Sequence, residues 1–354
     1  MSGTVSSRRS RRGKEAARRA GEAPVVRRAG EAPVASSRRE LRAAERGTRR
    51  AAPAAASFAS SLATPGAEAF ASSLAALEEI AAGGAVVSLR VADLDRGTEI
   101  VAGDDHLVLP VGGVGVVALL VEVAARFETG MLNPLDLVGA SEVEPVTVGG
   151  VWHRLTVPAL PVCDLAVLAA ATGDARAANA LLARVGLGAV RARLASLGLG
   201  ATALLDGFRD RRGLDDVPHV ALATTRELTD LFVALLGGHV VSPAVSAQVA
   251  EWLSFGHDLS LVASATGLDP FAHDDDRHGL LFVNKTGRAD GVCAEAGVLA
   301  VRVRALPMRS PSASTTSRRR TVPACTEPST CSAATSWSTC ADGPRGSSAG
   351  CVRR

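Results

Sequence analysis

The chain has 354 residues, which is enough for two ordinary domains or for one large domain with tails. Its hydrophobic content of 47% supports a sizeable core, but only 3% of the residues are aromatic and none is Tyr, so we expect a core of Ala, Val and Leu. The formal net charge is +3. No run of about 18 apolar residues occurs, which argues against a membrane-spanning helix. The N-terminus also lacks the apolar segment of a secretory signal, so a cytoplasmic location is the default expectation.

Residues 1–65 form a basic segment that we predict to be disordered. Arginine doublets alternate with Ala, Gly, Pro and Ser, and the octapeptide Arg-Arg-Ala-Gly-Glu-Ala-Pro-Val that begins at Arg18 is repeated from Arg27. Such a composition buries too little apolar surface to offset the chain entropy. A basic arm suits nucleic acid, but no aromatic residue is interleaved among the arginines to stack on bases. Nucleic acid is therefore not an expected partner.

The next residues predict a helix followed by a hairpin. Residues 70–80 have helical periodicity and are followed by a Gly-Gly stop, with one apolar face made of Phe70, Leu74, Leu77 and Ile80. Residues 85–94 alternate as a strand, and residues 98–102 return as its partner after a short turn.

A glycine-broken turn at residues 109–115 leads directly into a second helix, which ends at Gly130. Its first ten or so residues are apolar on every side, and a helix of that kind is buried all round rather than amphipathic. A helix N-terminus after a tight glycine turn is a common place for a nucleophile or an anion. In this chain the turn carries no side chain that can react.

Residues 130–261 predict an all-helical subdomain, interrupted by a loop at 204–219 that is rich in Asp and Arg. The helical patterns cover residues 165–182 (with a break near 172–174), 190–197, 225–236 and 243–253. Residues 279–287 and 292–303 then predict a second pair of strands. Beyond residue 304 the chain is rich in Ser, Thr, Arg, Pro and Cys, and we predict neither strand nor helix in the tail 304–354. A shifted reading frame is one hypothesis for this abrupt change.

Candidate metal ligands gather just before the second pair of strands, at His273, Asp274, Asp275, Asp276 and His278. A charge run in that position is more typical of a solvated loop. No C-x-x-C pair is present, which argues against a structural zinc site. We expect neither a metal nor a cofactor.

The order of these elements, together with Lys285-Thr286-Gly287 on a strand, resembles the class A β-lactamase and penicillin-binding serine hydrolase family over residues 66–303. The resemblance implies an α/β (α+β) fold, in which an antiparallel sheet flanked by helices is joined to the helical subdomain at about 130–261. The family ends in a strand that pairs inside the sheet and in a closing helix. The tail 304–354 offers no candidate for either, so we expect both to be missing.

Members of this family carry the motifs S-x-x-K, S-D-N and K-T-G. The first Ser attacks an amide carbonyl, and the Lys one helical turn later lowers the cost of deprotonating its hydroxyl. Backbone N–H groups near that Ser and on the K-T-G strand stabilise the oxyanion. The Lys and Thr of the strand hold the substrate carboxylate, and the Ser of the second motif relays a proton to the leaving nitrogen.

When the three motifs are aligned with this chain, only the third is complete. The nucleophile position is Gly113 and its Lys position is Val116. In the second motif Gly173 replaces Ser, Asp174 is retained and Ala175 replaces Asn. No shifted alignment restores S-x-x-K, because Lys14 and Lys285 are the only lysines and neither has Ser three residues earlier.

We therefore expect a monomeric serine hydrolase relative that is inactive as an acyl-serine enzyme. The loop 204–219 contains four Asp residues but no Glu, so the family's deacylating base is missing as well. The expected ligand is a β-lactam-like or peptide-like small molecule at Lys285, Thr286, Gly287 and Asn179. Asp174 and Asn179 also suit a purely structural role, because polar residues at a helix break often cap it.

Two alternative hypotheses are a non-catalytic ligand-binding relative of the family and a nucleotide-binding protein that uses the turn at residues 113–118. Residues 113–118 match G-x-G-x-x-A, with Asp136 at roughly the spacing of the ribose-binding acid. That fingerprint requires a buried parallel strand before it, and the preceding residues 106–111 are short and contain Pro110. A simple helix-entry turn is the favoured interpretation.

Overall fold

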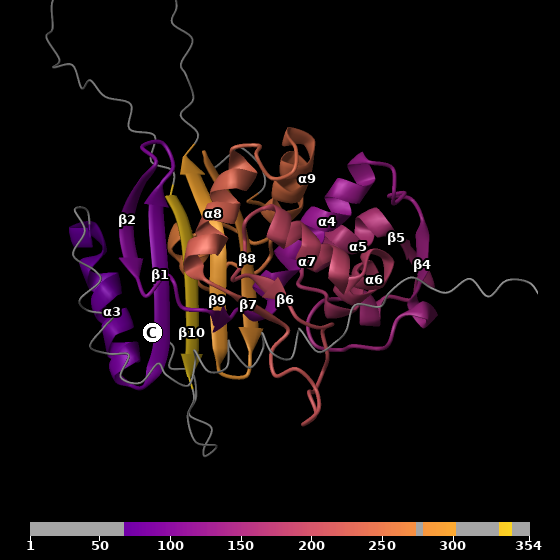
Figure 1. Cartoon of the computed structure of the whole chain (residues 1–354), viewed down its shortest axis with the longest axis horizontal. Helices are drawn as coiled ribbons and strands as arrows, with labels where there is room; N and C mark the ends of the chain where they lie inside the picture. Colours follow the sequence, from indigo (N-terminus) through magenta and orange to yellow (C-terminus); the bar gives the residue numbers. More distant parts are fainter. Residues whose placement is uncertain (1–66, 274–278, 302–332, 342–354) are drawn as a thin grey trace, which may run out of the picture. The chain divides into compact units, whose positions relative to one another are not determined.

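The computed structural model describes residues 67–273, 279–301 and 333–341 (Figure 1). The predicted disorder of residues 1–65 and most of the candidate metal cluster lie outside the described residues. Helices α3 to α9 cover Ala71–Ala82, Val116–Glu128, Val162–Ala171, Ala175–Val185, Leu187–Ser196, Thr225–Leu236 and Pro243–Ser254. Among the helices of these ranges, none combines the length and apolar character needed to cross a bilayer.

A five-stranded antiparallel sheet has the strand order β2-β1-β10-β9-β8 (Figure 1). In chain order its strands are β1 Ala85–Asp93, β2 Thr98–Gly103, β8 Leu280–Ala289, β9 Val292–Val301 and β10 Ala333–Ala341. Both predicted hairpins are confirmed: β1 pairs with β2, and β8 pairs with β9. The α+β class with an antiparallel sheet flanked by helices is confirmed too.

The prediction that no strand follows residue 304 is wrong. Strand β10 lies between β1 and β9, and its backbone pairs with both along eight or nine positions, such as Val87 with Thr339 and Ala296 with Ser336. Its sequence, Ala-Ala-Thr-Ser-Trp-Ser-Thr-Cys-Ala, lacks the apolar alternation that predicts a strand. The pairing satisfies the backbone groups of two strands that would otherwise be open edges, a non-local requirement. The predicted absence of a closing helix falls on residues 342–354, outside the described residues.

Helices cover both faces of this sheet. On one face Leu74, Leu77 and Ala81 of α3 pack against Val87, Leu89, Val91 and Val101. Ile80, predicted to belong to the same face, is exposed instead, because the buried stripe passes through Ala81. On the other face the Ser88 hydroxyl hydrogen-bonds with that of Thr225 at the start of α8, at 2.7 Å. Successive side chains of β1 therefore face different helices, as the alternation of a strand requires.

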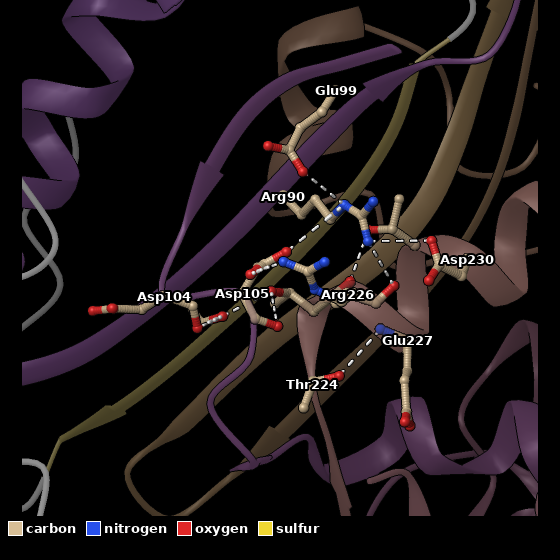
Figure 2. Close-up of polar contacts among 11 residues, drawn as sticks. Arg90, Glu99, Asp104, Asp105, Thr224, Arg226, Glu227 and Asp230 are labelled. Carbon is tan, nitrogen blue, oxygen red and sulfur yellow. Dashed lines mark hydrogen bonds and ion pairs between the residues drawn. The ribbon is translucent and has the colours of Figure 1, made fainter. Parts of the chain in front are cut away.

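A charge network centred on the buried Asp105 joins the β1–β2 hairpin to the N-terminus of α8 (Figure 2). The carboxylate of Asp105 lies 2.9 Å from the Arg226 guanidinium and 3.8 Å from Nε of Arg90. Arg90 also reaches Glu99 at 3.4 Å and Asp230 at 3.2 Å. These pairs hold α8 on the sheet, and α8 in turn borders the core that surrounds α4.

Helix α4 lies at the centre of the main core. Every residue from Val116 to Ala125 is buried, which confirms the prediction of a helix buried all round. Helices α5, α6, α7 and α9 contact it. The one acid in this stretch, Glu122, is paired with Arg126 at 2.8 Å and with Arg193 at 2.9 Å. The packing of α4 on all sides therefore fixes the position of the turn that precedes it.

Short elements complete the fold. The remaining strands are β3 Leu109–Pro110, β4 Leu137–Gly139, β5 Ala159–Pro161, β6 Ala203–Leu204 and β7 Ala221–Ala223. The 3-10 turns are η2 Ala67–Phe70, η3 Gly112–Gly115, η4 Ala140–Glu142, η5 Trp152–Arg154 and η6 Val262–Thr266. Turn η3 connects β3 to α4 and contacts β8. The glycine turn therefore lies against the strand that contains Lys285-Thr286-Gly287.

Candidate active-site cleft

A cleft of about 1250 Å³ opens beside β8. Five of its lining side chains are basic and three are acidic, so the cleft has an excess of positive charge. The lining comes from η3, the α5–α6 junction, the loop 204–219, the segment after α9, and β8. Its residues include Gly113, Gly173, Phe208, Arg209, Asp210, Arg211, Arg212, His219, His257, Asp258, Lys285, Thr286, Arg288 and Asp290. The structure thus brings the positions of all three sequence motifs to one cleft.

The glycine turn and β8 touch through their backbones. A Cβ atom at Gly287 would stand 2.0 Å from the carbonyl oxygen of Val111 and 2.8 Å from the amide nitrogen of Gly113, distances that no side chain can occupy. A Cβ at Gly113 would lie 3.2 Å from the carbonyl oxygen of Thr286. Gly287 is therefore required for the close approach, and Gly113 faces the K-T-G strand without a side chain.

A void of about 20 Å³ lies where the reacting side chains of the family would meet. It is lined by Gly113, Val116, Ala169, Gly173, Asp174, Ala175, Ala178, Phe208 and Lys285. Val116 is buried and apolar, so it neither activates a nucleophile nor carries a proton. Gly113, Val116 and Gly173, the positions at which the family resemblance leads us to expect reactive side chains, all line this one void.

Lys285 borders both the cleft and this void, and its side chain is buried. Its Nζ donates a hydrogen bond of 3.1 Å to the carbonyl oxygen of Thr286. A Cβ atom at Gly173 would lie 3.6 Å from Nζ, so the second motif directly faces this amine. Burial lowers the pKa of Lys285 to about 8, against the opposing fields of Asp258 and Glu295.

Two acids beside the K-T-G strand carry no signal in the sequence. Asp258 follows α9 and accepts a hydrogen bond from the Thr286 hydroxyl, and its carboxylate lies 3.7 Å from Nε of Arg288. Burial alone would raise the pKa of Asp258, but hydrogen bonds from Ser260 and Thr286 outweigh it and hold that pKa below its ordinary value. The Asp258 carboxylate thus accepts the hydrogen bond of the Thr286 hydroxyl. The family resemblance implies that this hydroxyl would instead bind a ligand carboxylate.

Glu295 fixes the segment that carries Asp258. Its carboxylate accepts hydrogen bonds from Nδ2 of Asn284 and from the backbone N–H of Val262, both at 2.6 Å. Asn284 also donates to the backbone carbonyl of Asp258 at 3.3 Å. Burial raises the pKa of Glu295 despite these bonds. Strands β8 and β9 thereby position the loop 258–262 beside the cleft.

The polar residues of the second motif support the backbone around the cleft. Asp174 is the N-cap of α6, accepting from Ala177, and its other oxygen accepts from the N–H groups of Val151 and Trp152. Asn179 holds the loop 204–219 through two 2.8 Å bonds with the backbone of Phe208, one donated and one accepted. Ala175 lies buried in the first turn of α6.

The acids of the loop 204–219 are held by neighbours. Asp206 is paired with Arg209 at 3.0 Å and Arg212 at 2.9 Å. Asp210 lines the cleft, but its carboxylate accepts hydrogen bonds from the backbone N–H groups of Thr147 and Val148, which lower its pKa. These bonds bind the loop to its surroundings.

The glycine turn does not have the setting of a dinucleotide fingerprint. The strand before it, β3, has two residues and is antiparallel to β7, whereas the fingerprint follows a buried parallel strand. Nor do the described residues contain three or more clustered His, Cys, Asp or Glu side chains arranged to hold a metal ion.

Comparisons with known proteins agree with this geometry. The sequence model of the β-lactamase enzyme family matches residues 69–306. A β-lactamase from Sphaerobacter thermophilus has a similar structure, with a TM-score of 0.59 and 19% identity over 77% of this chain and 89% of that one. A variant class A β-lactamase of the last common ancestor of Gram-negative bacteria gives 0.56 and 20% over 77% and 89%. The protein PBP-A gives 0.53 and 16% over 72% and 81%.

A comparison with curated protein sequences found no match. At these identities the solved structures establish the fold, while the family model, which covers most of the chain, establishes membership. The chain belongs to the β-lactamase enzyme family.

Proposed function

We propose that this chain is a non-hydrolytic member of the family that binds a small molecule reversibly in the cleft beside Lys285. The observation that carries the proposal is the small void lined by Gly113, Val116 and Gly173, three residues without a reactive side chain. The large cleft beside it is fully formed. Removing the nucleophile of a serine hydrolase costs on the order of 10⁶ in turnover. The remaining groups can hold a ligand but do not form an acyl-serine.

The ligand class follows from the charges of the cleft. Its basic excess favours an anionic or strongly polar molecule, and its volume is at the upper end for small-molecule sites. One structural neighbour is PBP-A as an acyl-enzyme complex with penicillin G, which makes a β-lactam a reasonable probe. In this chain a ligand carboxylate competes with Asp258 for the Thr286 hydroxyl. We therefore expect weak binding of β-lactams while Asp258 holds the Thr286 hydroxyl.

The test combines turnover, covalent mass and reversible binding. We expect no nitrocefin hydrolysis above the buffer rate and no mass increase of the intact chain after incubation with benzylpenicillin. Benzylpenicillin at millimolar concentration is expected to raise the thermal midpoint reversibly in the wild type. The increase should be larger in Asp258→Ala, which vacates the Thr286 hydroxyl, and lost in Lys285→Gln. Hydrolysis, or a penicillin adduct mapped to a Ser or Thr of the cleft, would refute the proposal.

A further inference from the structure

Lys285 combines burial with access to open space. Its side chain is buried, yet it borders the large cleft on one side and the void beneath Gly173 on the other. Among the described residues its Nζ has one hydrogen bond, donated to the carbonyl oxygen of Thr286. An ammonium group has three donors, so the pocket does not fully solvate the charged form.

The surroundings of Lys285 allow part of its amine to be unprotonated near physiological pH. Burial lowers its pKa to about 8, and the nearby carboxylates that oppose this shift are Asp258 and Glu295. Asp174 lines the same void, but both of its oxygens accept backbone hydrogen bonds. About a tenth of the Lys285 side chains are therefore unprotonated near pH 7, whereas an ordinary lysine is neutral in well under one part in a thousand.

We propose that the amine of Lys285 is a nucleophile that forms an imine with a small aldehyde entering the cleft. The Nζ lone pair adds to the carbonyl carbon, and the C=O π pair moves to oxygen, which takes up the proton that the nitrogen gives up, so that a neutral carbinolamine forms. The nitrogen then expels the hydroxyl group, which leaves as water after gaining a second proton, and a C=N bond forms. The sum is amine plus aldehyde plus one proton giving a protonated imine and water, with no redox change.

The charges of the site favour an aldehyde over an acyl donor. A protonated imine retains the positive charge that Asp258 and Glu295 face, whereas an amide would remove it and leave both acids without a cation on that side. The cleft of about 1250 Å³ that Lys285 lines provides room for the new substituent. Desolvation of a lysine amine is a recognised way of activating it for imine formation.

The experiment is reductive trapping with the full chain. The protein is incubated with butyraldehyde and cyanoborohydride, and the alkylated residues are identified by peptide mapping. Because Lys14 is the only other lysine, it serves as an internal reference. We expect Lys285 to be labelled on the order of tenfold or more faster than Lys14 near pH 7, with a rate that rises to a plateau above about pH 8. This advantage should vanish in urea.

Two matched variants sharpen the test. Asp258→Asn removes a carboxylate that raises the pKa of Lys285, so the midpoint of labelling should move to lower pH. Asp290→Asn removes another acid of the cleft lining and should leave the midpoint unchanged. Equal rates for Lys285 and Lys14 in the folded wild type would overturn the proposal.

The inference rests on the same open cleft as the proposed binding function, but the two fail separately. Labelling that fails in a chain that still binds benzylpenicillin rejects the imine alone. Selective labelling without benzylpenicillin binding rejects the binding proposal alone.

Discussion

The carboxylate of Asp174 accepts a 2.7 Å hydrogen bond from the backbone N–H of Trp152, which lies 22 residues earlier in the chain. The same carboxylate caps α6 through Ala177 and accepts from Val151. Asp174 thus connects the start of α6 to the loop that borders the cleft.

Replacing Asp174 with Ala should lower the free energy of unfolding by about 2–4 kcal/mol, because a helix cap is lost and the N–H groups of Val151 and of the buried Trp152 lose their acceptor. Urea denaturation measures this loss. Asp230→Ala is the control, since that acid is exposed in its pair with Arg90, and a change below about 1 kcal/mol is expected there. Equal losses in the two variants would mean that Asp174 is not a structural anchor.

Asp105 is the buried centre of the network in Figure 2. In Asp105→Ala the half-buried Arg90 loses a partner and the N-terminus of α8 loses its bond through Arg226, so we expect a loss of about 2–4 kcal/mol. Glu99→Gln removes a more exposed partner of Arg90 and should cost less than about 1 kcal/mol. Thermal unfolding followed by circular dichroism compares the two, and a smaller effect at Asp105 than at Glu99 would contradict this account.

Gly287 allows β8 to approach the glycine turn. A methyl group there would stand 2.0 Å from the carbonyl oxygen of Val111, so Gly287→Ala must displace β8 or the turn. Overpacking of this kind costs about 1–3 kcal/mol or more. Gly213→Ala is the control, because its nearest neighbour would be the Asp216 side chain at 3.6 Å. A chemical denaturation midpoint for Gly287→Ala equal to that of the control would refute the close contact.

Lys285 should make stability rise with pH in an alkaline window. The unfolded chain protonates this residue below about pH 10.5, and the folded chain only below about pH 8. Between these values the unfolded state holds more protons, so the free energy of unfolding increases as pH rises. Relative to Lys285→Met, the wild type should gain about 3 kcal/mol from pH 8 to 10.5. The chain has no Tyr and only one other Lys, and its six Cys residues, which also titrate in this window, are common to both proteins, so their contributions cancel in the comparison. A pH-independent difference between wild type and variant would exclude the shift.

Restoring the first motif alone should not restore hydrolysis. In Gly113→Ser combined with Val116→Lys, the nucleophile and its Lys return, but Gly173 and Ala175 still lack the second motif. Gly173 also has a φ of +64°, a left-handed conformation that disfavours Ser there. We expect nitrocefin turnover to stay far below ordinary β-lactamase rates. Full turnover in this double variant would show that the second motif is dispensable.

Local patterns were sufficient for much of the fold. The continuous apolar run of α4, the alternation of β1 and the Lys-Thr-Gly strand are each encoded within a few neighbouring residues, so their periodicity identifies them. The prediction that Gly113 and Val116 stand in place of the family's Ser and Lys also rests on the sequence alone, because Lys14 and Lys285 are the only lysines. Ile80 was misplaced because a helical stripe read from apolar residues alone overlooks Ala81.

The relationships that connect distant residues were decided by the tertiary structure. Strand β10 has no apolar pattern of its own and is defined by two partners whose backbones need it. Asp258 reaches Thr286, and Asp105 reaches Arg226 across 121 positions, without any spacing that a motif could express. The sequence alone predicted the family and the absence of reactive side chains at Gly113 and Val116. The surroundings of Lys285, and hence its lowered pKa, arise only when β8, α6 and the loop after α9 enclose it, because desolvation and charge act through space.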